Sequence, residues 1–219
     1  MLTLVATPIG RTDEITLRSL ELLKAADVVI CESTKEASKL LKAHGLKALR
    51  YEVLNEHSNA EDVAQLLELC RQFNVVLVSD CGTPSFCDPG FQLVRLCRRA
   101  GVGVQTSLGA SSLMGLLSLS SEKLESFYFR GFLPAENAAR EKEWLQLKKN
   151  KSALVLMDTP YRLQKLLAEC IQHLPDRRVL LTLNLSQPDE QVLEGTAEQV
   201  KGQLKFEKAE FMILVYAHL

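Results

Sequence analysis

Three short segments of the chain combine glycine or proline with small hydroxyl residues, and each directly follows an apolar run. They are Thr7–Gly10, then Ser79–Pro84 with Asp88-Pro89-Gly90 after it, and Leu108–Ser112. Glycine lets a ligand approach the backbone, proline fixes a bend, and Asp80 adds a carboxylate at the end of a buried run. Turns of this composition are common between strands and helices, so the signal lies in the order of the three segments.

None of the three segments is a G-x-x-x-x-G-K-[ST] phosphate loop or a G-x-G-x-x-G fingerprint, which argues against ATP and NAD as ligands. The six cysteines include no C-x-x-C pair and the four histidines are scattered, so we expect no metal site. The cysteines are predicted to be buried free thiols in a reducing compartment, and Cys81 and Cys87 to pack beside the second segment.

The charged residues nearly balance, with 26 Lys and Arg against 27 Asp and Glu. This balance does not favour a protein that holds nucleic acid mainly through bulk electrostatics. No run approaches the roughly 18 apolar residues of a spanning helix, and the amino end lacks the basic start of a secretory signal. We therefore expect a soluble cytoplasmic protein without a membrane partner.

The elements that position the three segments alternate along the first half of the chain. Short apolar runs predict strands at 2–6, 27–31, 47–53, 74–80 and 102–106. Amphipathic patterns between and after them predict helices at 14–25, capped by Thr12 or Asp13, and at 34–43, 60–72, 90–100 and 110–119. This alternation is typical of a parallel sheet with helices on both faces, where ligands bind beyond the carboxyl ends of the strands.

After Ser120 the predicted strands and helices no longer alternate regularly. Strands are predicted at 126–132, 152–158, 177–184, 190–195 and 211–217, and helices at 137–149, 160–173 and 196–204. The short polar link between 177–184 and 190–195 indicates antiparallel neighbours, hence a mixed sheet. We predict two α/β domains, residues 1–119 with a mostly parallel sheet and residues 120–219 with a mixed one.

Four motifs then resemble one known family: TPIGRTDEIT at 7–16, SDCGTPSFCDPG at 79–90, GFLP at 131–134 and LMDTPYR at 156–162. Together they resemble the tetrapyrrole methylase superfamily, and within it the group of ribosomal RNA small-subunit methyltransferases I. The resemblance implies a two-domain methyltransferase, usually a homodimer, with S-adenosylmethionine in the cleft between the domains. It implies methylation of a ribose 2′-hydroxyl on small-subunit ribosomal RNA.

The same resemblance assigns the cofactor contacts by position. In the first loop Pro8 would line the cofactor pocket. After the fourth strand, Asp80, Gly82 and Thr83 would contact the methionine part of the cofactor or its ribose. The residues matched in this way are Pro8, Asp80, Gly82, Thr83, Ser111, Ser112, Met157, Asn184 and Leu185.

The candidate catalytic residues are Glu32, Lys35 and Asp158, placed by hypothesis on the acceptor side of the cleft. A hydroxyl nucleophile must lose its proton, and Glu32 is the candidate base, while Lys35 would hold a phosphate or lower the pKa of a neighbour. The alternative for Glu32 and Lys35 is a solvated pair at a helix start. For Asp80 the alternative is a cap on the turn that follows it.

Several charged positions depart from the pattern typical of the family. Glu-Asp-Thr-Arg is replaced by Glu32–Lys35, Pro-Gly-Pro by Leu108–Ala110, and Glu-Ser-Pro-His-Arg by Asp158–Arg162. Three functions therefore stay open: a methyltransferase acting on ribosomal RNA, a methyltransferase acting on a small tetrapyrrole-like acceptor, and a non-catalytic protein that binds the cofactor or RNA.

Three further predictions concern the second domain. Arg162 either pairs with Asp158 at (i, i+4) or faces RNA. Trp144 is a packing anchor rather than a platform for bases. The basic residues around it are interspersed with glutamates and are expected to form a solvated helix face; they are Arg140, Lys142, Lys148, Lys149 and Lys151.

Overall fold

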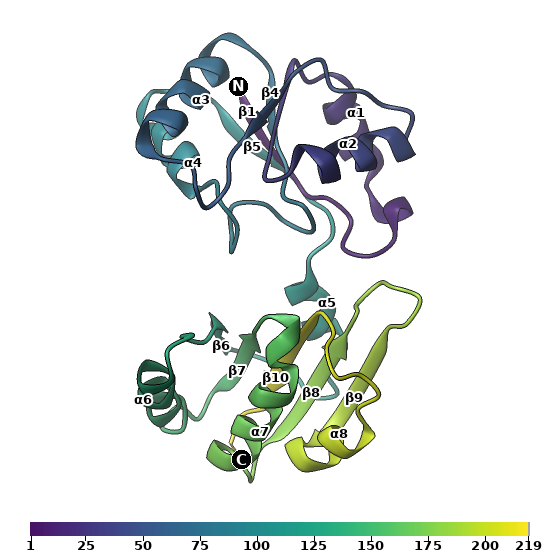
Figure 1. The fold of residues 1–219 in the computed structure, drawn as a ribbon, viewed down its shortest axis with the longest axis vertical. Coiled ribbons are helices and arrows are strands. Elements are labelled where there is room, and N and C mark those ends of the chain that lie inside the picture. Colours follow the sequence, from purple (N-terminus) through teal and green to yellow (C-terminus); the bar gives the residue numbers. More distant parts are fainter. Residues whose placement is uncertain (219) are drawn as a thin grey trace. The chain divides into compact units, whose positions relative to one another are not determined.

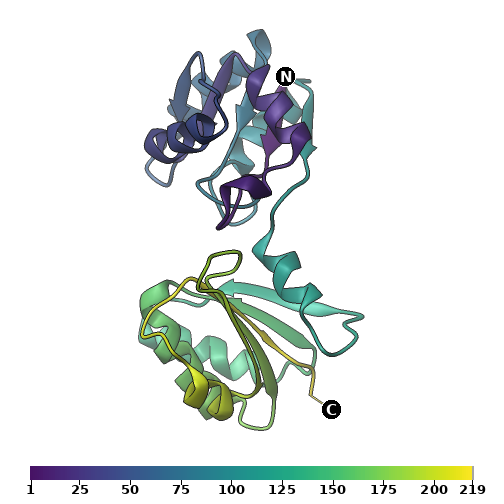
Figure 2. The ribbon, with the colours of Figure 1, turned by 90° about the vertical axis from the view of Figure 1, so that its right-hand side faces the viewer.

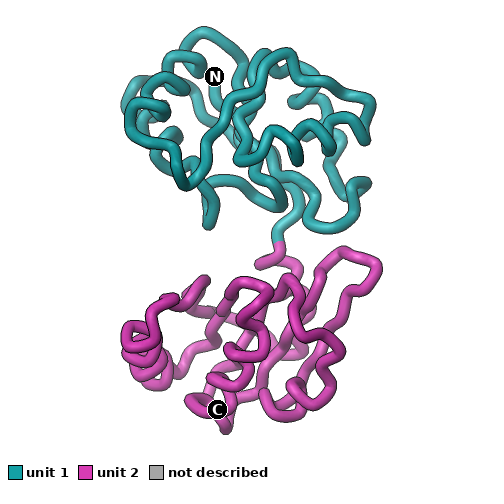
Figure 3. The backbone as a smooth tube through the Cα atoms, viewed as in Figure 1, with its two compact units in different colours: residues 1–111 teal, residues 112–219 magenta. Residues whose placement is uncertain are grey.

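A computed structural model describes residues 1–218 of the chain. It divides them into two compact units, residues 1–111 and the chain from Ser112 onward (Figure 3). Each unit has its own five-stranded sheet and its own hydrophobic core.

The first unit is built on a fully parallel sheet in the order β3-β2-β4-β1-β5. Strands β2 and β4 are buried at every residue, which is why they read as continuous apolar runs in the sequence. The strands are β1 (Leu2–Val5), β2 (Val28–Cys31), β3 (Tyr51–Val53), β4 (Val75–Leu77) and β5 (Val104–Ser107).

Helices cover both faces of this sheet (Figure 1). Alternate residues of β2 point to opposite faces, so Ile30 packs with α3 and α4 while Val29 packs with α1 and α2. The helices are α1 (Leu17–Lys24), α2 (Thr34–Ala43), α3 (Ala60–Gln72) and α4 (Phe91–Arg99), with a short 3₁₀ helix η1 (Thr12–Glu14) before α1.

The second unit has a mixed sheet, as predicted, and its strand order is β6-β7-β10-β8-β9. Only β6 and β7 run parallel, and β10 is antiparallel to both of its neighbours. The antiparallel pair of β8 and β9 is also confirmed. The strands are β6 (Phe127–Phe132), β7 (Ala153–Met157), β8 (Arg178–Leu183), β9 (Gln191–Thr196) and β10 (Phe211–Val215).

Three helices cover one face of the second sheet and α5 covers the other (Figure 2). Trp144 and Leu166 belong to the core on the three-helix side, and Leu116 belongs to the core under α5. The helices are α5 (Ser112–Ser118), α6 (Asn137–Leu147), α7 (Leu163–His173) and α8 (Ala197–Gln203), with a 3₁₀ helix η2 (Pro160–Arg162) before α7.

Two local differences from the sequence predictions have simple causes. The first long helix begins after Thr16, not after Thr12 or Asp13, because the Thr16 hydroxyl accepts the backbone N–H of Ser19 at 3.0 Å. The compact units divide at Ser111/Ser112, whereas the predicted division at 119/120 leaves α5 in the first domain. This helix buries Leu116 completely against the second sheet, which explains the difference.

No helix within residues 1–218 is both long enough and apolar enough to cross a lipid bilayer.

Candidate active site

Two of the sequence motifs are joined at the carboxyl ends of neighbouring strands β1 and β4. Thr7 and Gly82 exchange backbone hydrogen bonds of 2.9 and 3.0 Å, which form an isolated antiparallel bridge between the two loops. Gly82 has a φ of +76°, a conformation that costs a side-chain-bearing residue strain. The glycine is therefore required by the turn that carries the motif.

Buried hydroxyl groups fix the same loop from inside. Thr7 donates its hydroxyl to the carbonyl of Ser79 at 3.1 Å. Ser79 in turn donates to the carbonyls of Cys81 and Gly82, at 3.1 and 3.3 Å. Because both hydroxyl groups are buried and satisfied within the loop, they hold its shape, and the exposed Asp80 and Thr83 are left to face a ligand.

The loop after β5 joins this surface. The Thr83 hydroxyl donates to the carbonyl of Ala110 at 3.1 Å. Gly109 packs so closely on the end of β1 that an added Cβ would lie 2.9 Å from the Ala6 Cβ. Two of the predicted cofactor residues, Asp80 and Thr83, are thus exposed in the same loop, and the third, Gly82, is buried between them.

Two acidic side chains tie the ends of β2 and β4 together at the same edge. The backbone N–H of Asp80 donates to Glu32 Oε1 at 3.3 Å, and the backbone N–H of Ser33 donates to Asp80 Oδ1 at 3.2 Å. The hydroxyl of Ser33 also accepts the N–H of Glu36 and so caps α2. The candidate base and the candidate cofactor carboxylate are therefore positioned by each other's loops.

A third carboxylate, Asp88, belongs to the same group. Burial raises the pKa of Glu32, and the nearby charges of Asp88 and Asp80 raise it further. The pKa of Asp88 is raised by burial, against a hydrogen bond from Ser79, and that of Asp80 is raised by burial, against the Ser33 N–H. The three side chains form an electronegative group that favours positively charged ligands.

The sequence analysis did not choose Asp88 as a site residue, although it noted the Asp88-Pro89-Gly90 turn. The signal lay in that motif, but the closeness of Asp88 to Glu32 depends on how the loop 79–90 folds. Lys35, the second catalytic candidate, lies exposed on α2, and the described residues contain no ion pair between it and Glu32. The remaining first-unit candidates are Pro8, buried in the loop after β1, and Ser111, the last residue of that unit.

In the second unit, three cofactor candidates lie beside α5, which begins at Ser112. Met157, at the end of β7, packs in the core that includes Leu116. Leu185 lies against the same helix, since a Cβ added to Gly115 would lie 2.7 Å from its Cδ2. Met157 and Leu185 therefore both pack beside α5.

Asn184 organises the loop after β8. It has a φ of +47°, its side-chain oxygen accepts the N–H of Glu210 at 3.1 Å, and its amide donates to Asp189 at 2.7 Å. Asparagine tolerates the left-handed conformation better than most residues. The structure thus gives Asn184 a clear role in shaping its loop.

Asp158 is held in a buried ion-pair network. Its carboxylate lies 2.8 Å from Arg140 Nη2 and 3.3 Å from Arg162 Nη1, so of the two alternatives for Arg162 the structure shows the (i, i+4) pairing with Asp158. Arg140 also contacts Glu169 at 2.8 Å and donates to the carbonyl of Pro134 at 3.2 Å. The prediction that Arg140 lies on a solvated helix face is wrong, because its partners lie far away in the sequence and leave it 2% exposed.

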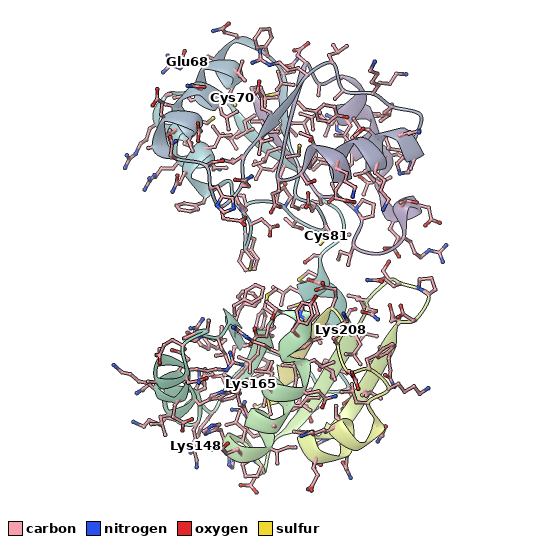
Figure 4. The ribbon with its side chains drawn as sticks, in the orientation of Figure 1. Glu68, Cys70, Cys81, Lys148, Lys165 and Lys208 are labelled. Atoms are coloured by element: carbon pink, nitrogen blue, oxygen red, sulfur yellow. The ribbon has the colours of Figure 1, made fainter. Side chains whose placement is uncertain are left out.

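The cysteine prediction is correct for four residues and wrong for two. Cys31, Cys70, Cys97 and Cys170 are buried free thiols, whereas Cys81 and Cys87 are exposed in the loop after β4 (Figure 4 labels Cys70 and Cys81). The apolar runs that bury the other thiols do not extend into this loop.

Trp144 is confirmed as a packing anchor. It is 1% exposed, and its ring stacks on His173 with the centroids 5.2 Å apart.

Comparisons with known proteins show the family of the chain. A family model described as Tetrapyrrole (Corrin/Porphyrin) Methylases matches residues 1–201. The ribosomal RNA small subunit methyltransferase I of Neisseria meningitidis serogroup B is 33% identical over 217 residues, 97% of this chain and 74% of that protein. The protein of the same name from Coprothermobacter proteolyticus is 36% identical over 219 residues, 99% of this chain and 97% of that protein.

A solved structure shares the fold. The uroporphyrin-III C-methyltransferase of Thermus thermophilus, complexed with S-adenosylhomocysteine, aligns with a TM-score of 0.64 at 21% identity. The alignment covers 97% of this chain and 96% of that one. The predicted two-sheet α/β architecture is thereby confirmed.

Proposed function

This chain belongs to the tetrapyrrole (corrin/porphyrin) methylase family of S-adenosylmethionine-dependent methyltransferases, and we propose that its acceptor is a ribose 2′-hydroxyl of small-subunit ribosomal RNA. The observation that carries the proposal is the likeness, at 33 and 36% identity over nearly the whole chain, to two proteins named for small-subunit ribosomal RNA. Structural likeness at 21% identity supports only the fold.

The first unit suits the cofactor by charge and by shape. S-adenosylmethionine carries a sulfonium and an ammonium charge, and the edge formed by Glu32, Asp80 and Asp88 is electronegative. The neighbouring Thr83 is exposed, and its hydroxyl donates to the Ala110 carbonyl and keeps acceptor capacity, while the buried Gly82 holds the turn beside Asp80. We infer that these groups hold the polar end of the cofactor.

The remaining cofactor contacts are proposed from the resemblance. They are Pro8 and Ser111 in the first unit and Ser112, Met157, Asn184 and Leu185 in the second.

When bound, the cofactor supplies an activated methyl group, so the protein mainly has to align the acceptor oxygen for an in-line displacement. Glu32 is the proposed base that accepts the hydroxyl proton. Its half-buried carboxylate has a raised pKa, which makes it a better proton acceptor than an ordinary glutamate once it is ionised. Lys35, exposed on the helix that follows, is proposed to hold a phosphate of the RNA.

In this proposal Asp158 is a positioning residue and does not contact the reacting atoms. Its side chain is fully buried and its charge is met by Arg140 and Arg162, so it positions the segment 158–162 rather than reacting. Arg140 connects the same carboxylate to the GFLP segment through the carbonyl of Pro134. The network therefore fixes two family motifs in the second unit.

A homodimer, which the family resemblance implies, and a cytoplasmic location, which the sequence analysis predicts, are part of the proposal. Two other functions remain as competitors. One is a methyltransferase whose acceptor is a small tetrapyrrole-like molecule, an alternative that the description of the matching family favours. A non-catalytic binding role is favoured by the replacements at Glu32–Lys35 and Asp158–Arg162.

One experiment separates the three functions. Purified protein is incubated with methyl-labelled S-adenosylmethionine and either undermethylated small ribosomal subunits or uroporphyrinogen III, and calorimetry measures cofactor binding in parallel. Label in the ribose of small-subunit RNA supports the proposal. Label only in the tetrapyrrole supports the second function, and binding without transfer supports the third.

A further inference from the structure

A cavity of about 540 Å³ lies beside β3, an edge strand of the first sheet. Pockets that hold small ligands typically measure about 300–1,000 Å³, so this volume can receive a long side chain together with the backbone that carries it. We call it the β3-edge cavity. Its lining comes from β3, the loop after β3 and α3, and includes Glu52, Val53, Asp62, Leu66 and Leu69.

The backbone of β3 is paired on one side only, with β2. The N–H of Val29 in β2 donates to the carbonyl of Arg50 at 2.9 Å, so the backbone groups of Arg50 and Glu52 face β2. Because the backbone groups of alternate residues point to opposite edges of a strand, those of Tyr51 and Val53 face away from the sheet. Val53 also leaves 43% of its surface exposed. This free edge can accept an extended chain as a further strand.

Two carboxylates in the cavity lining each keep one oxygen available. Glu52 uses Oε1 to accept the guanidinium of Arg50 at 2.6 Å, which also neutralises that arginine. Asp62 uses Oδ2 to accept the backbone N–H of Asn59 at 2.8 Å. Within residues 1–218 the second oxygen of each carboxylate has no hydrogen bond or ion pair. Both oxygens can therefore accept a hydrogen bond from a bound cation.

The charge and the apolar lining of the cavity indicate what kind of group it suits. From residue 51 to residue 70 the sequence contains no Lys or Arg, and a surface of this sign attracts cations. Leu66 and the half-buried Leu69 offer apolar surface for an alkyl chain. A lysine side chain combines an alkyl stem with an ammonium group. The acidic residues of this stretch are Glu52, Glu56, Glu61, Asp62 and Glu68.

We propose that the β3-edge cavity is a docking site for an extended, lysine-bearing segment of a partner protein. The segment adds to β3 through the backbone groups of Tyr51 and Val53. It places one lysine with its stem over the leucines of α3 and its ammonium group at Glu52 and Asp62. In this mode of binding the main-chain hydrogen bonds supply affinity and the pocket for the side chain supplies specificity. The inference goes beyond the proposed function and does not depend on it.

The first test changes the probe and leaves the protein intact. A fluorescein-labelled peptide of alternating lysine and valine is titrated with the full chain, and its Kd is measured by anisotropy. Replacing every lysine with norleucine keeps the stems and removes the charges, and methylating the backbone nitrogens blocks strand pairing. We expect each change to raise the Kd at least about tenfold.

The second test changes the protein at two positions. Val53→Pro removes an N–H that faces the free edge and leaves the hydrogen bonds to β2 in place, so we expect the Kd to rise about tenfold. Asp62→Asn keeps an oxygen that can accept the Asn59 N–H but removes a charge. We expect it to raise the Kd about threefold and to make binding less sensitive to salt.

Matched controls lie outside the cavity. The Leu2 N–H donates to the Gly103 carbonyl, so the N–H of Val104 faces the other free edge of the same sheet, and Val104→Pro should leave peptide binding unchanged. Asp176→Asn removes an exposed carboxylate of the second unit and should also have no effect. If Val53→Pro fails to fold, as judged by its thermal unfolding, the altered peptides still test the inference on the wild type.

The failures of this inference and of the proposed function are distinguishable, because methyl transfer to RNA is measured without the peptide. If the lysine–valine peptide binds more weakly than about 1 mM, or as well after backbone methylation as before, the docking site is rejected. If single-stranded RNA binds at this edge in place of the peptide, and Val53→Pro weakens that binding, the inference is wrong. It is equally wrong if sedimentation shows that Val53→Pro separates a dimer while peptide binding is unchanged, since the edge then pairs with a second copy.

Discussion

Glu32 and Asp80 are linked through each other's backbone: the N–H of Asp80 donates to the Glu32 carboxylate, and the N–H of Ser33 donates to the Asp80 carboxylate. The link joins the carboxyl ends of two adjacent parallel strands, β2 and β4. A ligand that draws either carboxylate toward it therefore acts on both loops. This coupling connects the proposed cofactor site to the proposed base.

Replacing Asp80 with Asn tests the charge at the cofactor site. The amide oxygen can still accept the Ser33 N–H, so the loop should keep its shape while the attraction to the cationic cofactor is lost. We expect the Kd for S-adenosylmethionine, measured by calorimetry, to rise about tenfold, a loss of about 1.4 kcal/mol. The free energy of unfolding should change by less than about 1 kcal/mol.

The chain offers a closely matched control for this variant. Asp27 lies just before β2 and accepts the backbone N–H of Asn74, just before β4, at 2.9 Å. It makes the same kind of hydrogen bond between the same two strands, but at their amino ends rather than their carboxyl ends. Asp27→Asn should leave cofactor affinity unchanged, and equal affinity in Asp80→Asn and the wild type would remove Asp80 from the site.

Cofactor binding should depend on pH through the same carboxylates. The pKa values of Glu32, Asp80 and Asp88 are raised in the free protein, so these groups take up protons at a higher pH than ordinary carboxyl groups. A cationic ligand favours their ionised forms, so affinity should rise as the pH rises through their pKa values and weaken as the pH falls from 7 toward about 4. Calorimetry across this range should show a shallower dependence for Asp80→Asn, and a pH-independent Kd in the wild type contradicts the assignment.

Glu32→Gln tests the proposed base. An amide cannot accept the hydroxyl proton, so we expect kcat to fall about 100-fold while the Kd for S-adenosylmethionine changes less than threefold. Glu21→Gln, on the exposed face of α1, serves as the control for loss of an acidic side chain. Turnover is measured with methyl-labelled cofactor and small subunits over a range of pH. A variant with the wild-type rate removes Glu32 from the proton transfer.

The sequence predicted most of the fold because the two sheets are formed by local patterns. The continuous apolar runs of β2 and β4 indicate strands that are buried on both faces. The short polar link between β8 and β9 indicates an antiparallel pair. What failed depended on distant partners. Arg140 sits between Glu136 and Glu141 in a sequence typical of a solvated helix, and only the folded chain places Asp158 and Glu169 around it.

The candidate site shows the same limit. The sequence identified Asp80 because it directly follows an apolar run, and it offered Glu32 as a hypothesis that depended on the family resemblance. It did not identify Asp88, whose closeness to Glu32 arises from the path of a loop with little periodic pattern. The exposure of Cys81 and Cys87 was missed for that reason as well.

Thiol labelling tests the loop directly. In the folded protein only Cys81 and Cys87 should react with a maleimide, because the other four thiols are buried and burial raises the pKa of Cys31 to about 11 and of Cys70 to about 12. Mass spectrometry of digested protein identifies the labelled sites. Because Cys81 lies between Asp80 and Gly82, bound S-adenosylmethionine should slow its labelling more than that of Cys87. Equal rates with and without the cofactor would place the ligand elsewhere.

Arg140→Met tests whether the buried network stabilises the second unit. The substitution leaves Asp158, whose side chain is fully buried, and Glu169, which is largely buried, without their shared guanidinium partner. Removing one member of a buried ion pair typically costs about 3–5 kcal/mol, and because Arg162 still contacts Asp158 we expect about 3 kcal/mol.

The chain has a single tryptophan, Trp144, buried on the same helix as Arg140, so its fluorescence during urea unfolding reports on the second unit. Lys142→Met, on that helix, should change the free energy of unfolding by less than about 0.5 kcal/mol. Adding Asp158→Asn to Arg140→Met should restore part of the loss, because one unpaired charge is removed. A deficit below about 1 kcal/mol would show that Arg140 is dispensable for the stability of this unit.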